Sequence, residues 1–306
     1  MPNLTRLAAR ANLAVLRRML DKMGPGNRAW LAGQIMQDRS ASGTVALADF
    51  CRKAIFSWKN KQYDVRRNGE EALLDRLRPF APALLLDVGA NVGDWSLAAC
   101  RHLPSATVHA FEIAPRTAEE LRNNAEAAFP DRLVVNGIGL GDHEGEITIY
   151  FSDESTTATS TIHDVFAISA AEHGIRSLTE VAARITTGDA YLREHGLDRV
   201  NFLKIDVEGA ELAVLQGFGE AFDRGAIELV QFEYGPINVR TRRFLEDYCS
   251  FFTERGFEVG KLYPEGVAFR PFGSRDEDFT GPNYIACHES RRDIRDALHW
   301  SAPILE

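Results

Sequence analysis

Hydrophobic positions change their spacing near residue 83, and this change divides the chain. Between residues 4 and 23, apolar side chains recur at roughly helical spacing with arginines between them, and Gly24-Pro25-Gly26 ends the pattern. Residues 28–80 are mostly polar and predict further helices. We therefore expect residues 1–80 to form a helical N-terminal extension that caps the rest of the chain.

After residue 83, short apolar runs alternate with amphipathic stretches. The pattern predicts strands over 83–88, 107–112 and 133–135, and helices over 94–102 and 116–128. Such alternation is typical of an α/β fold with a mostly parallel sheet. Residues 147–151 alternate as an edge ribbon does, whereas the Ser- and Thr-rich residues 152–161 predict a loop, and we consider it a candidate substrate loop. We expect an α/β domain over 81–290 and a tail over 291–306.

The first predicted strand ends in an acidic residue and a glycine turn. Asp87 is followed by Gly89, Asn91 and Gly93, just where a helix should begin. The dinucleotide fingerprint GxGxxG has glycine at the position of Asn91, because a pyrophosphate must approach the backbone there. A cofactor without phosphates, such as S-adenosylmethionine, suits an Asn at this position.

A second feature supports a nucleoside cofactor. Glu112 ends the second predicted strand and lies nineteen positions after Gly93. A strand-terminal carboxylate at about this spacing holds ribose hydroxyls in nucleotide-binding folds. The alternative is a carboxylate that only caps the next helix.

Three charged residues follow one another at a later strand end. Lys204 and Asp206 project from one side of the predicted strand 200–206, and Glu208 follows before Gly209 opens a helix. The strand Ile227–Phe232 ends in Glu233. Open α/β sheets bind ligands at the carboxyl ends of their strands, so we expect these side chains to meet in one crevice.

These segments resemble the FkbM family of S-adenosylmethionine-dependent methyltransferases. The resemblance is carried by Asp87 to Gly93, Lys204 to Glu211 and Phe232 to Gly235, and it covers roughly residues 83–265. It implies a class I Rossmann-like fold with a seven-stranded sheet. It also implies O-methylation of a hydroxyl on a sugar, glycan or secondary metabolite.

Several cofactor contacts follow from the resemblance. It places Asp87, Gly89, Asn91 and Gly93 around the methionine half of S-adenosylmethionine, with Glu112 at the ribose. Asp142 stands where similar enzymes contact the adenine amino group, although a solvated turn carboxylate is an alternative for it.

Methyl transfer to an alcohol requires a base or a metal ion at the attacking oxygen. Our hypothesis is that Asp206 or Glu233 acts as the base or as an Mg²⁺ ligand, with Glu208 beside them. Lys204 would hold the charge and orientation of the cluster. The alternative is a structural one: Lys204 and Asp206 form a buried ion pair, and Glu208 caps the helix at Gly209.

Other side chains are weaker candidates for the chemistry. Four histidines can act as bases, and we favour His163 because it follows the predicted loop; the others are His143, His173 and His195. Trp95 is expected to pack in the core rather than to stack on adenine.

Composition narrows the function classes. The net charge of −9 disfavours a nucleic-acid binder. The four cysteines are widely spaced, no run of about 18 apolar residues occurs, and arginines interrupt the N-terminus where a signal peptide would be apolar, so we expect a cytoplasmic protein. The basic first helix can lie on a membrane, form a homodimer interface or pack on its own domain, and we favour the last.

Two alternatives to a methyltransferase remain open. A nicotinamide-dependent oxidoreductase would share the sheet and Glu112, but the glycine at the position of Asn91 is missing. A catalytically silent S-adenosylmethionine-binding module would bind the cofactor without turnover.

Overall fold

The chain divides into two compact units. A computed structural model describes residues 14–152, 155–160 and 179–302, and the units are Met1–Trp58 and Lys59–Glu306. Residues 59–80, which we had grouped with the helical extension, belong to the larger unit. The role of the smaller unit as a cap stays a prediction.

The described residues of the smaller unit form helices joined by short turns. Residues 14–21 are helical, and α2 Pro25–Ile35 and α3 Ser42–Trp58 follow. This confirms the predicted first helix for residues 14–21, while its residues 4–13 lie outside the described part. In the described chain, we find no helix with the length and apolar character that a membrane span requires.

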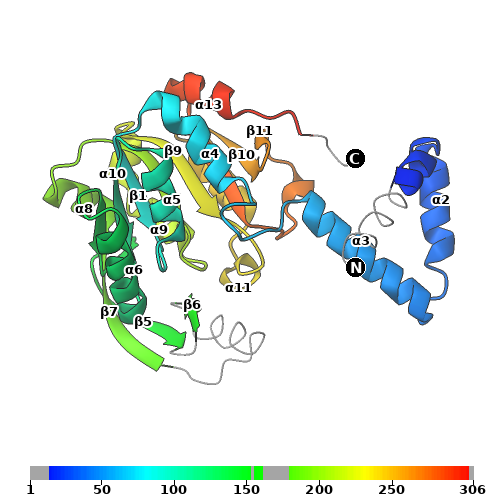
Figure 1. The fold of residues 1–306 in the computed structure, drawn as a ribbon, viewed down its shortest axis with the longest axis horizontal. Coiled ribbons are helices and arrows are strands. Elements are labelled where there is room, and N and C mark those ends of the chain that lie inside the picture. Colours follow the sequence, from blue (N-terminus) through cyan, green and yellow to red (C-terminus); the bar gives the residue numbers. More distant parts are fainter. Residues whose placement is uncertain (1–13, 153–154, 161–178, 303–306) are drawn as a thin grey trace. The chain divides into compact units, whose positions relative to one another are not determined.

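An eight-stranded sheet organises the larger unit, with the order β11-β10-β12-β9-β8-β1-β2-β3 (Figure 1). The strands are β1 Leu84–Val88, β2 Thr107–Phe111, β3 Leu133–Asn136, β8 Val200–Ile205, β9 Ile227–Glu233, β10 Phe257–Tyr263, β11 Gly266–Phe269 and β12 Asn283–His288. Strands β3, β2, β1, β8 and β9 pair in parallel, and β12 and β11 run against them. The mostly parallel Rossmann-like sheet is confirmed.

The expected number of seven strands is wrong. The eighth strand is β11, which pairs antiparallel with β10 at the edge of the sheet. It forms because the chain reverses directly after β10, where Gly266 adopts a φ of 145°. A side chain on Gly266 would lie 2.6 Å from the carbonyl oxygen of Leu298, so the reversal requires glycine.

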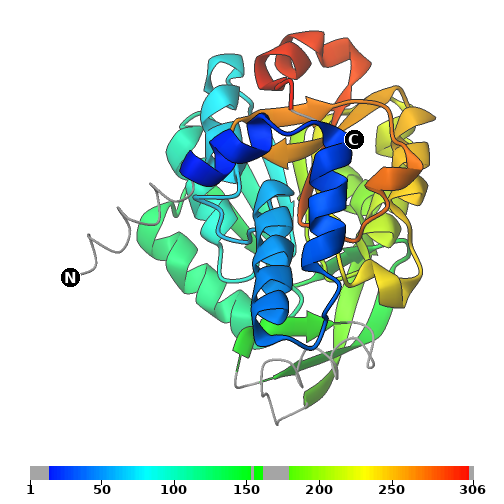
Figure 2. The same cartoon turned by 90° about the vertical axis from the view of Figure 1, so that its right-hand side faces the viewer.

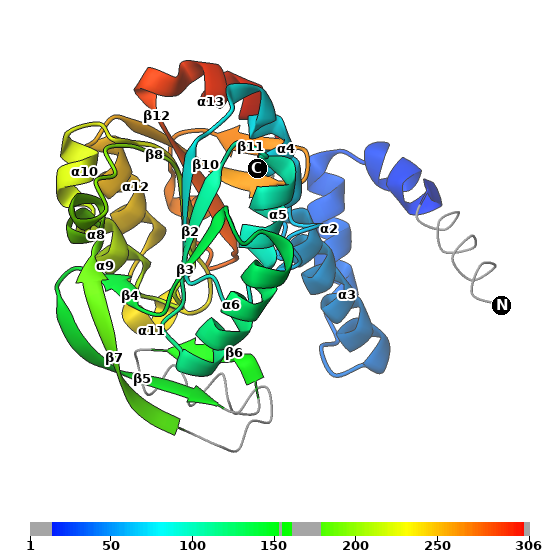
Figure 3. The ribbon, with the colours of Figure 1, turned by 60° about the vertical axis from the view of Figure 1, so that its left-hand side comes forward.

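Helices cover both faces of this sheet (Figure 3). One face packs against α4 Glu70–Leu77, α5 Asp94–His102, α6 Pro115–Ala128 and α13 Arg292–Leu298. The other packs against α8 Gly188–Glu194, α9 Glu211–Gln216, α10 Gly219–Asp223 and α12 Leu245–Thr253. Strand β1 shows why both layers are needed: Leu85 enters the first core, whereas Leu84 and Leu86 enter the second.

The predicted elements agree with these bounds to within one or two residues. The helix expected from Gly209 begins at Glu211 instead, because Glu208 and Gly209 both have positive φ, 54° and 102°. The remaining short elements are α11 Asn238–Thr241 and the 3₁₀ segments Arg78–Phe80, Ser274–Asp276 and Glu289–Arg291.

A second, four-stranded sheet has the order β4-β7-β5-β6. Its strands are β4 Gly139–Gly141, β5 Gly145–Ser152, β6 Ser155–Ser160 and β7 Thr179–Thr187. The predicted strand over 147–151 is confirmed as part of β5, but its expected position at a sheet edge is wrong, because β5 pairs with β7 on one side and β6 on the other. The predicted loop over 152–161 is wrong for residues 155–160, because their backbone pairs with β5. Residues 153, 154 and 161 lie outside the described chain.

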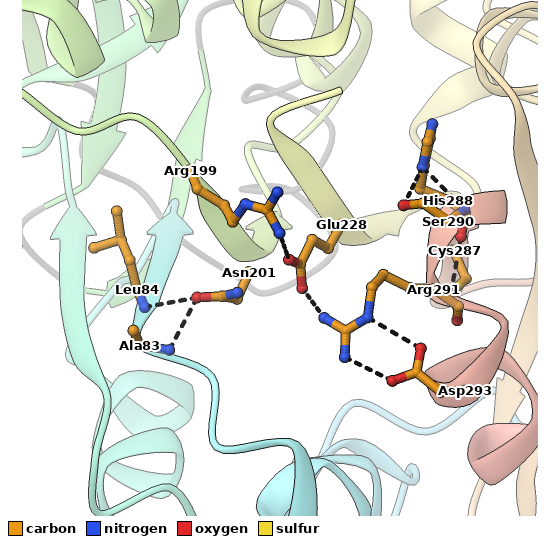
Figure 4. Close-up of polar contacts among 10 residues, drawn as sticks. All are labelled: Ala83, Leu84, Arg199, Asn201, Glu228, Cys287, His288, Ser290, Arg291 and Asp293. Atoms are coloured by element: carbon orange, nitrogen blue, oxygen red, sulfur yellow. Dashed lines mark hydrogen bonds and ion pairs between the residues drawn. The ribbon is translucent and has the colours of Figure 1, made fainter. Parts of the chain in front are cut away.

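Polar contacts fix the amino-terminal end of the main sheet (Figure 4). Oδ1 of Asn201 accepts hydrogen bonds from the backbone N–H groups of Ala83 and Leu84, at 2.9 and 3.1 Å. The buried carboxylate of Glu228 pairs with Arg199 at 2.6 Å and also with Arg291. These contacts align β1, β8 and β9 at one end, so their opposite ends meet in register.

Candidate active site

The turn after β1 has the conformation that its glycines predict. Gly89, Asn91 and Gly93 have φ values of 80°, 50° and 98°. A side chain on Gly89 would lie 1.8 Å from the backbone oxygen of Asp206, so only glycine lets the turns after β1 and β8 come this close. Gly93 is the residue before α5. The turn therefore brings the ends of two neighbouring strands together.

Glu112 ties this turn to the end of β2. Its Oε2 accepts a hydrogen bond from the backbone N–H of Asn91 at 2.9 Å, and its Oε1 accepts one from Ala114 at 2.8 Å. Ala114 precedes α6, so the capping role that we had considered is present. Burial raises the pKa of Glu112, and the two N–H groups act in the opposite direction. The carboxylate also lines a cavity, so a ribose contact stays a prediction for it.

Lys204 lies among three carboxylates. Its Nζ is 3.0 Å from Oδ1 of Asp87 and 3.5 Å from Oδ2 of Asp206. The expected Lys204–Asp206 pair is therefore present, while the closer partner, Asp87, was not foreseen. Burial alone would lower the pKa of Lys204, but the carboxylates of Asp87, Asp206 and Glu70 raise it. The ammonium group thus stays charged inside the protein.

Asp87 is completely buried beneath the turn. Its Oδ2 accepts a hydrogen bond from Oγ of Ser96 at 2.6 Å, in addition to the Lys204 contact. Strand register explains the pairing, because Lys204 of β8 lies opposite Asp87 of β1. We had placed Asp87 against the methionine half of the cofactor; the contacts show that it also anchors Lys204.

Glu70 is a buried carboxylate that the sequence did not reveal. It opens α4, and its oxygens accept hydrogen bonds from Asn68 Nδ2 and Gln231 Nε2, both at 2.5 Å. Gln231 is the register partner of Lys204 on β9. Burial raises the pKa of Glu70, and the charge of Lys204 lowers it. No local motif marks this residue, because its partners are far away in the sequence.

Asp206, Glu208 and Glu233 form an acidic cluster at the ends of β8 and β9. Glu233 is hydrogen-bonded to Asp206, and its pKa is raised well above the ordinary value by burial, then by the charges of Asp206 and Glu208. Two carboxyl groups share a hydrogen bond only when one holds a proton, and the raised pKa of Glu233 favours its protonated form. Crowding within the cluster desolvates the carboxyl group of Glu208 and raises its pKa, and the charges of Asp206 and Glu211 add to this, although part of the residue reaches solvent.

Glu211 stabilises the turn that carries the cluster. It is completely buried, and its Oε1 accepts hydrogen bonds from the backbone N–H groups of Val207 and Gly209, at 3.1 and 3.0 Å. Burial raises its pKa to about 7. The N-cap residue of α9 is Ala210, which makes no side-chain capping bond, so the capping role that we had weighed for Glu208 is wrong. An acidic residue just after a glycine turn is the signal that could have identified Glu211.

A cavity of about 620 Å³ opens between these turns and the second sheet. This volume is in the usual range for small-molecule sites, about 300–1,000 Å³. Six of the predicted site residues line it: Gly89, Asn91, Glu112, Asp142, Asp206 and Glu208. The other four, Asp87, Gly93, Lys204 and Glu233, do not line the cavity and support the residues that do.

The second sheet supplies the opposite wall, which sequence reasoning missed. Leu140 of β4, Ile147 of β5 and Ile185 of β7 line the cavity together with Phe111 of β2. Val181, Ala183 and Ile185 alternate along β7, so the signal for a strand was present in the sequence.

The charged side chains that line the cavity are acidic. Four carboxylates line the cavity, from Glu112, Asp142, Asp206 and Glu208, and among its described lining residues there is no Lys or Arg. A cationic sulfonium nucleoside without phosphates fits this set: carboxylates face the cation and the ribose hydroxyls, and apolar side chains face a base. A dinucleotide pyrophosphate would instead meet like charge.

The histidines divide into three groups. His143 lines the cavity, and its Nδ1 lies 2.7 Å from Oδ1 of Asp142, whose carboxylate is half exposed. His195 stacks on Tyr191, with ring centroids 4.1 Å apart. His163, which we had favoured, and His173 lie outside the described residues. Trp95 packs in the core as expected, edge-on to Phe202 at 5.3 Å.

Tyr63 lies near the acidic cluster although it precedes the α/β domain in the sequence. Partial desolvation raises the pKa of Tyr63 to about 12 although 57% of the residue is exposed, and the charges of Glu233, Glu208 and Asp206 add to this effect. Within the described chain, no group of three or more His, Cys, Asp or Glu residues is arranged to hold a metal ion.

Comparison with known proteins identifies the family. The model of the methyltransferase FkbM domain matches residues 87–259. The chain belongs to this family. The match contains the glycine turn, Glu112 and the acidic cluster, but it excludes Tyr63 and Glu70.

Similar proteins include methyltransferases from distant organisms. Hexuronic acid methyltransferase AglP of Haloferax volcanii is 28% identical over 196 residues, which are 64% of this chain and 68% of AglP. Methyltransferase 1 of Beauveria bassiana is 29% identical over 170 residues, or 49% of this chain and 66% of that protein. The solved FkbM methyltransferase of Methylobacillus flagellatus matches at 15% identity with a TM-score of 0.43, covering 68% of this chain and 44% of its own. This chain thus spans less than two thirds of the length of Methyltransferase 1 and of the solved FkbM methyltransferase.

Proposed function

We propose that this FkbM family member transfers a methyl group from S-adenosylmethionine to a hydroxyl of a sugar, glycan or secondary metabolite. The observation that carries the proposal is the cavity at the glycine turn, lined by four carboxylates and by no described Lys or Arg. When bound, S-adenosylmethionine supplies an electrophilic methyl carbon on a cationic sulfur. The nicotinamide alternative is disfavoured because its pyrophosphate needs cationic or backbone N–H partners.

Glu112 and Asp142 are the residues that would hold the nucleoside, and Asn91 would lie against the methionine half of the cofactor. Glu112 accepts hydrogen bonds from Asn91 and Ala114, and each of its oxygens keeps acceptor capacity for a ribose hydroxyl. Asp142 lies on the same cavity and can accept from an exocyclic amine. Gly89 and Gly93 keep the turn in the conformation that presents these groups.

Asp206 is the proposed general base. It lines the cavity, whereas Glu233 does not, and the raised pKa of Glu233 favours its protonated form. As the acceptor oxygen forms its bond to the methyl carbon, its proton passes to the carboxylate of Asp206. The sulfur keeps the electron pair of the broken bond and becomes a neutral thioether. Lys204, 3.5 Å from Asp206, keeps that carboxylate oriented.

An alternative role for Asp206 and Glu233 is to hold Mg²⁺ through oxygen ligands. Exhaustive chelation separates the two roles. Activity that survives chelation assigns Asp206 as a base, and activity restored only by added Mg²⁺ assigns it as a ligand.

The acceptor class rests on the family and on one relative. AglP is named a hexuronic acid methyltransferase, which supports a sugar hydroxyl as the acceptor here. The test is transfer of a labelled methyl group from S-adenosylmethionine to a panel of sugars, uronic acids and polyketide alcohols. Product from at least one hydroxyl acceptor supports the proposal. Cofactor binding without product from any acceptor would identify a silent binding module.

We also infer a cytoplasmic location. The four cysteines, Cys51, Cys100, Cys249 and Cys287, are all free thiols, which suits a reducing compartment.

A further inference from the structure

The smaller unit has no core of its own. Among residues 14–58, no side chain is buried, and Trp30 is 66% exposed and Phe50 54% exposed. Isolated helices of the length of α2 and α3 are marginal in water, and packing of an apolar face supplies most helix stability in proteins. The smaller unit therefore needs another surface to cover its apolar side chains if its helices are to be stable.

A row of apolar side chains follows one side of α3, while the exposed Val45 and Ile55 lie outside this row. Phe50, Ala54 and Trp58 recur at intervals of four residues, and Leu47 precedes Phe50 by three. The other side of the helix carries charges: Asp49 pairs with Arg52 and Lys53, at 2.7 Å each. Figure 2 shows α2 and α3 in blue. The helix is thus amphipathic, with an exposed apolar face and cations beside it.

The charge of this unit is opposite to that of the rest. Residues 1–58 contain nine Lys and Arg against three Asp and Glu, whereas residues 59–306 contain 26 against 41. A basic segment in an acidic chain is drawn to anionic surfaces. The covering surface must accept both the cations and the apolar face of α3 with Trp58.

We propose that residues 14–58 dock on the surface of an anionic phospholipid membrane. The apolar face of α3, defined by Leu47, Phe50, Ala54 and Trp58, enters the headgroup boundary, while the cations of the unit, Arg52 and Lys53 among them, are attracted to the anionic surface. The helix lies along the surface and does not cross the bilayer, in agreement with the lack of a spanning helix among the described residues. Nucleic acid would satisfy the cations but would leave the apolar face exposed to water.

Vesicle flotation of the full chain tests this proposal. Vesicles of phosphatidylcholine alone are compared with vesicles of phosphatidylcholine and phosphatidylglycerol, at low and high salt. We expect the protein to float only with anionic vesicles and to be released by salt. The double variants Phe50→Gln/Trp58→Gln and Arg52→Gln/Lys53→Gln should each weaken partitioning roughly tenfold or more.

Matched controls lie on the larger unit. Val239 is 55% exposed, a fraction similar to the 54% of Phe50. Val239→Gln therefore controls for loss of an exposed apolar side chain. Arg275→Gln controls for loss of an exposed cation. Both controls should float like the wild type, and circular dichroism should show unchanged helix content in all variants.

Several results would overturn the proposal. Absence of the chain from the vesicle fraction at low salt is one such result, and flotation of Phe50→Gln/Trp58→Gln like the wild type is another. A vesicle-free dimer that this variant dissociates would assign the apolar face of α3 to a second copy. If the chain is a monomer and its smaller unit is protected from hydrogen exchange without vesicles, the apolar face of α3 is covered by the larger unit. Methyl transfer is measured separately, so these outcomes leave the proposed function untouched.

Discussion

The ammonium nitrogen of Lys204 lies 3.0 Å from Oδ1 of Asp87. This pair joins two neighbouring strands of the parallel sheet directly beneath the glycine turn. Both side chains are buried, so neither charge can be satisfied by bulk water. The pair therefore links the stability of the fold to the geometry of the candidate site, because Lys204 also contacts Asp206.

Removing Lys204 should destabilise the fold strongly. Lys204→Met leaves the carboxylate of Asp87 buried without a cation, which typically costs about 3–5 kcal/mol of unfolding free energy. Urea denaturation followed by circular dichroism measures this loss. The double variant Lys204→Met/Asp87→Asn should recover part of it, because the unpaired charge is then gone. Lys53→Met, in the exposed pair with Asp49, is the control and should change stability little.

Neutralising Asp206 should separate binding from turnover. Asp206→Asn keeps the shape of the cavity and a hydrogen bond to Glu233 but removes the proposed base, so turnover should fall about 10²–10⁴-fold. Calorimetry should show S-adenosylmethionine binding close to that of the wild type. Asp198→Asn, an exposed carboxylate before β8, is the matched control. Full turnover in Asp206→Asn would remove this residue from the mechanism.

Neutralising Glu112 should instead weaken binding of the cofactor. Glu112→Gln retains an acceptor oxygen but loses the charge, and hydrogen bonds to charged groups contribute about 1.5–3 kcal/mol, so affinity should fall roughly 10–100-fold. Isothermal titration with S-adenosylhomocysteine measures the change. Glu119→Gln, on the exposed side of α6, is the control. Equal affinity in Glu112→Gln and wild type would leave Glu112 only its capping role.

Stability should depend on pH through Glu211. Burial raises its pKa from 4.5 to about 7, so the folded chain holds a proton that the unfolded chain releases earlier. This contribution is complete below about pH 4.5 and is lost as the pH rises through about 7, on the order of 3 kcal/mol in all.

Glu211→Gln should remove this dependence while keeping the acceptor for Val207 and Gly209. The difference in unfolding free energy between variant and wild type should therefore grow, in favour of the variant, from about pH 5 to about pH 8. Glu265→Gln, an exposed carboxylate in the turn after β10, should show no such trend. A pH-independent difference for Glu211→Gln would contradict the assignment.

The sequence could predict those parts of the site that are formed by residues close together along the chain. The glycine turn from Gly89 to Gly93 follows from one apolar run and two glycines, and Asp206 follows from an acidic residue at a strand end. The contacts of Lys204 with Asp87 and of Gln231 with Glu70 could not be predicted, because they depend on strand register between distant segments.

The fold shows the same division. Strand β1 and helix α5 are set by strong local periodicity and agree with prediction. Strand β11 is only four residues long, and the backbone of β6 is set by pairing rather than by an apolar pattern, so both escaped prediction.

Isothermal titration of the purified chain with S-adenosylmethionine, S-adenosylhomocysteine and NAD(H) tests the central claim most directly. The account predicts that the methyl donor and its thioether product bind at one site per chain, and that NAD(H) does not bind. A folded chain that binds NAD(H), or that binds neither the donor nor the thioether, would contradict it.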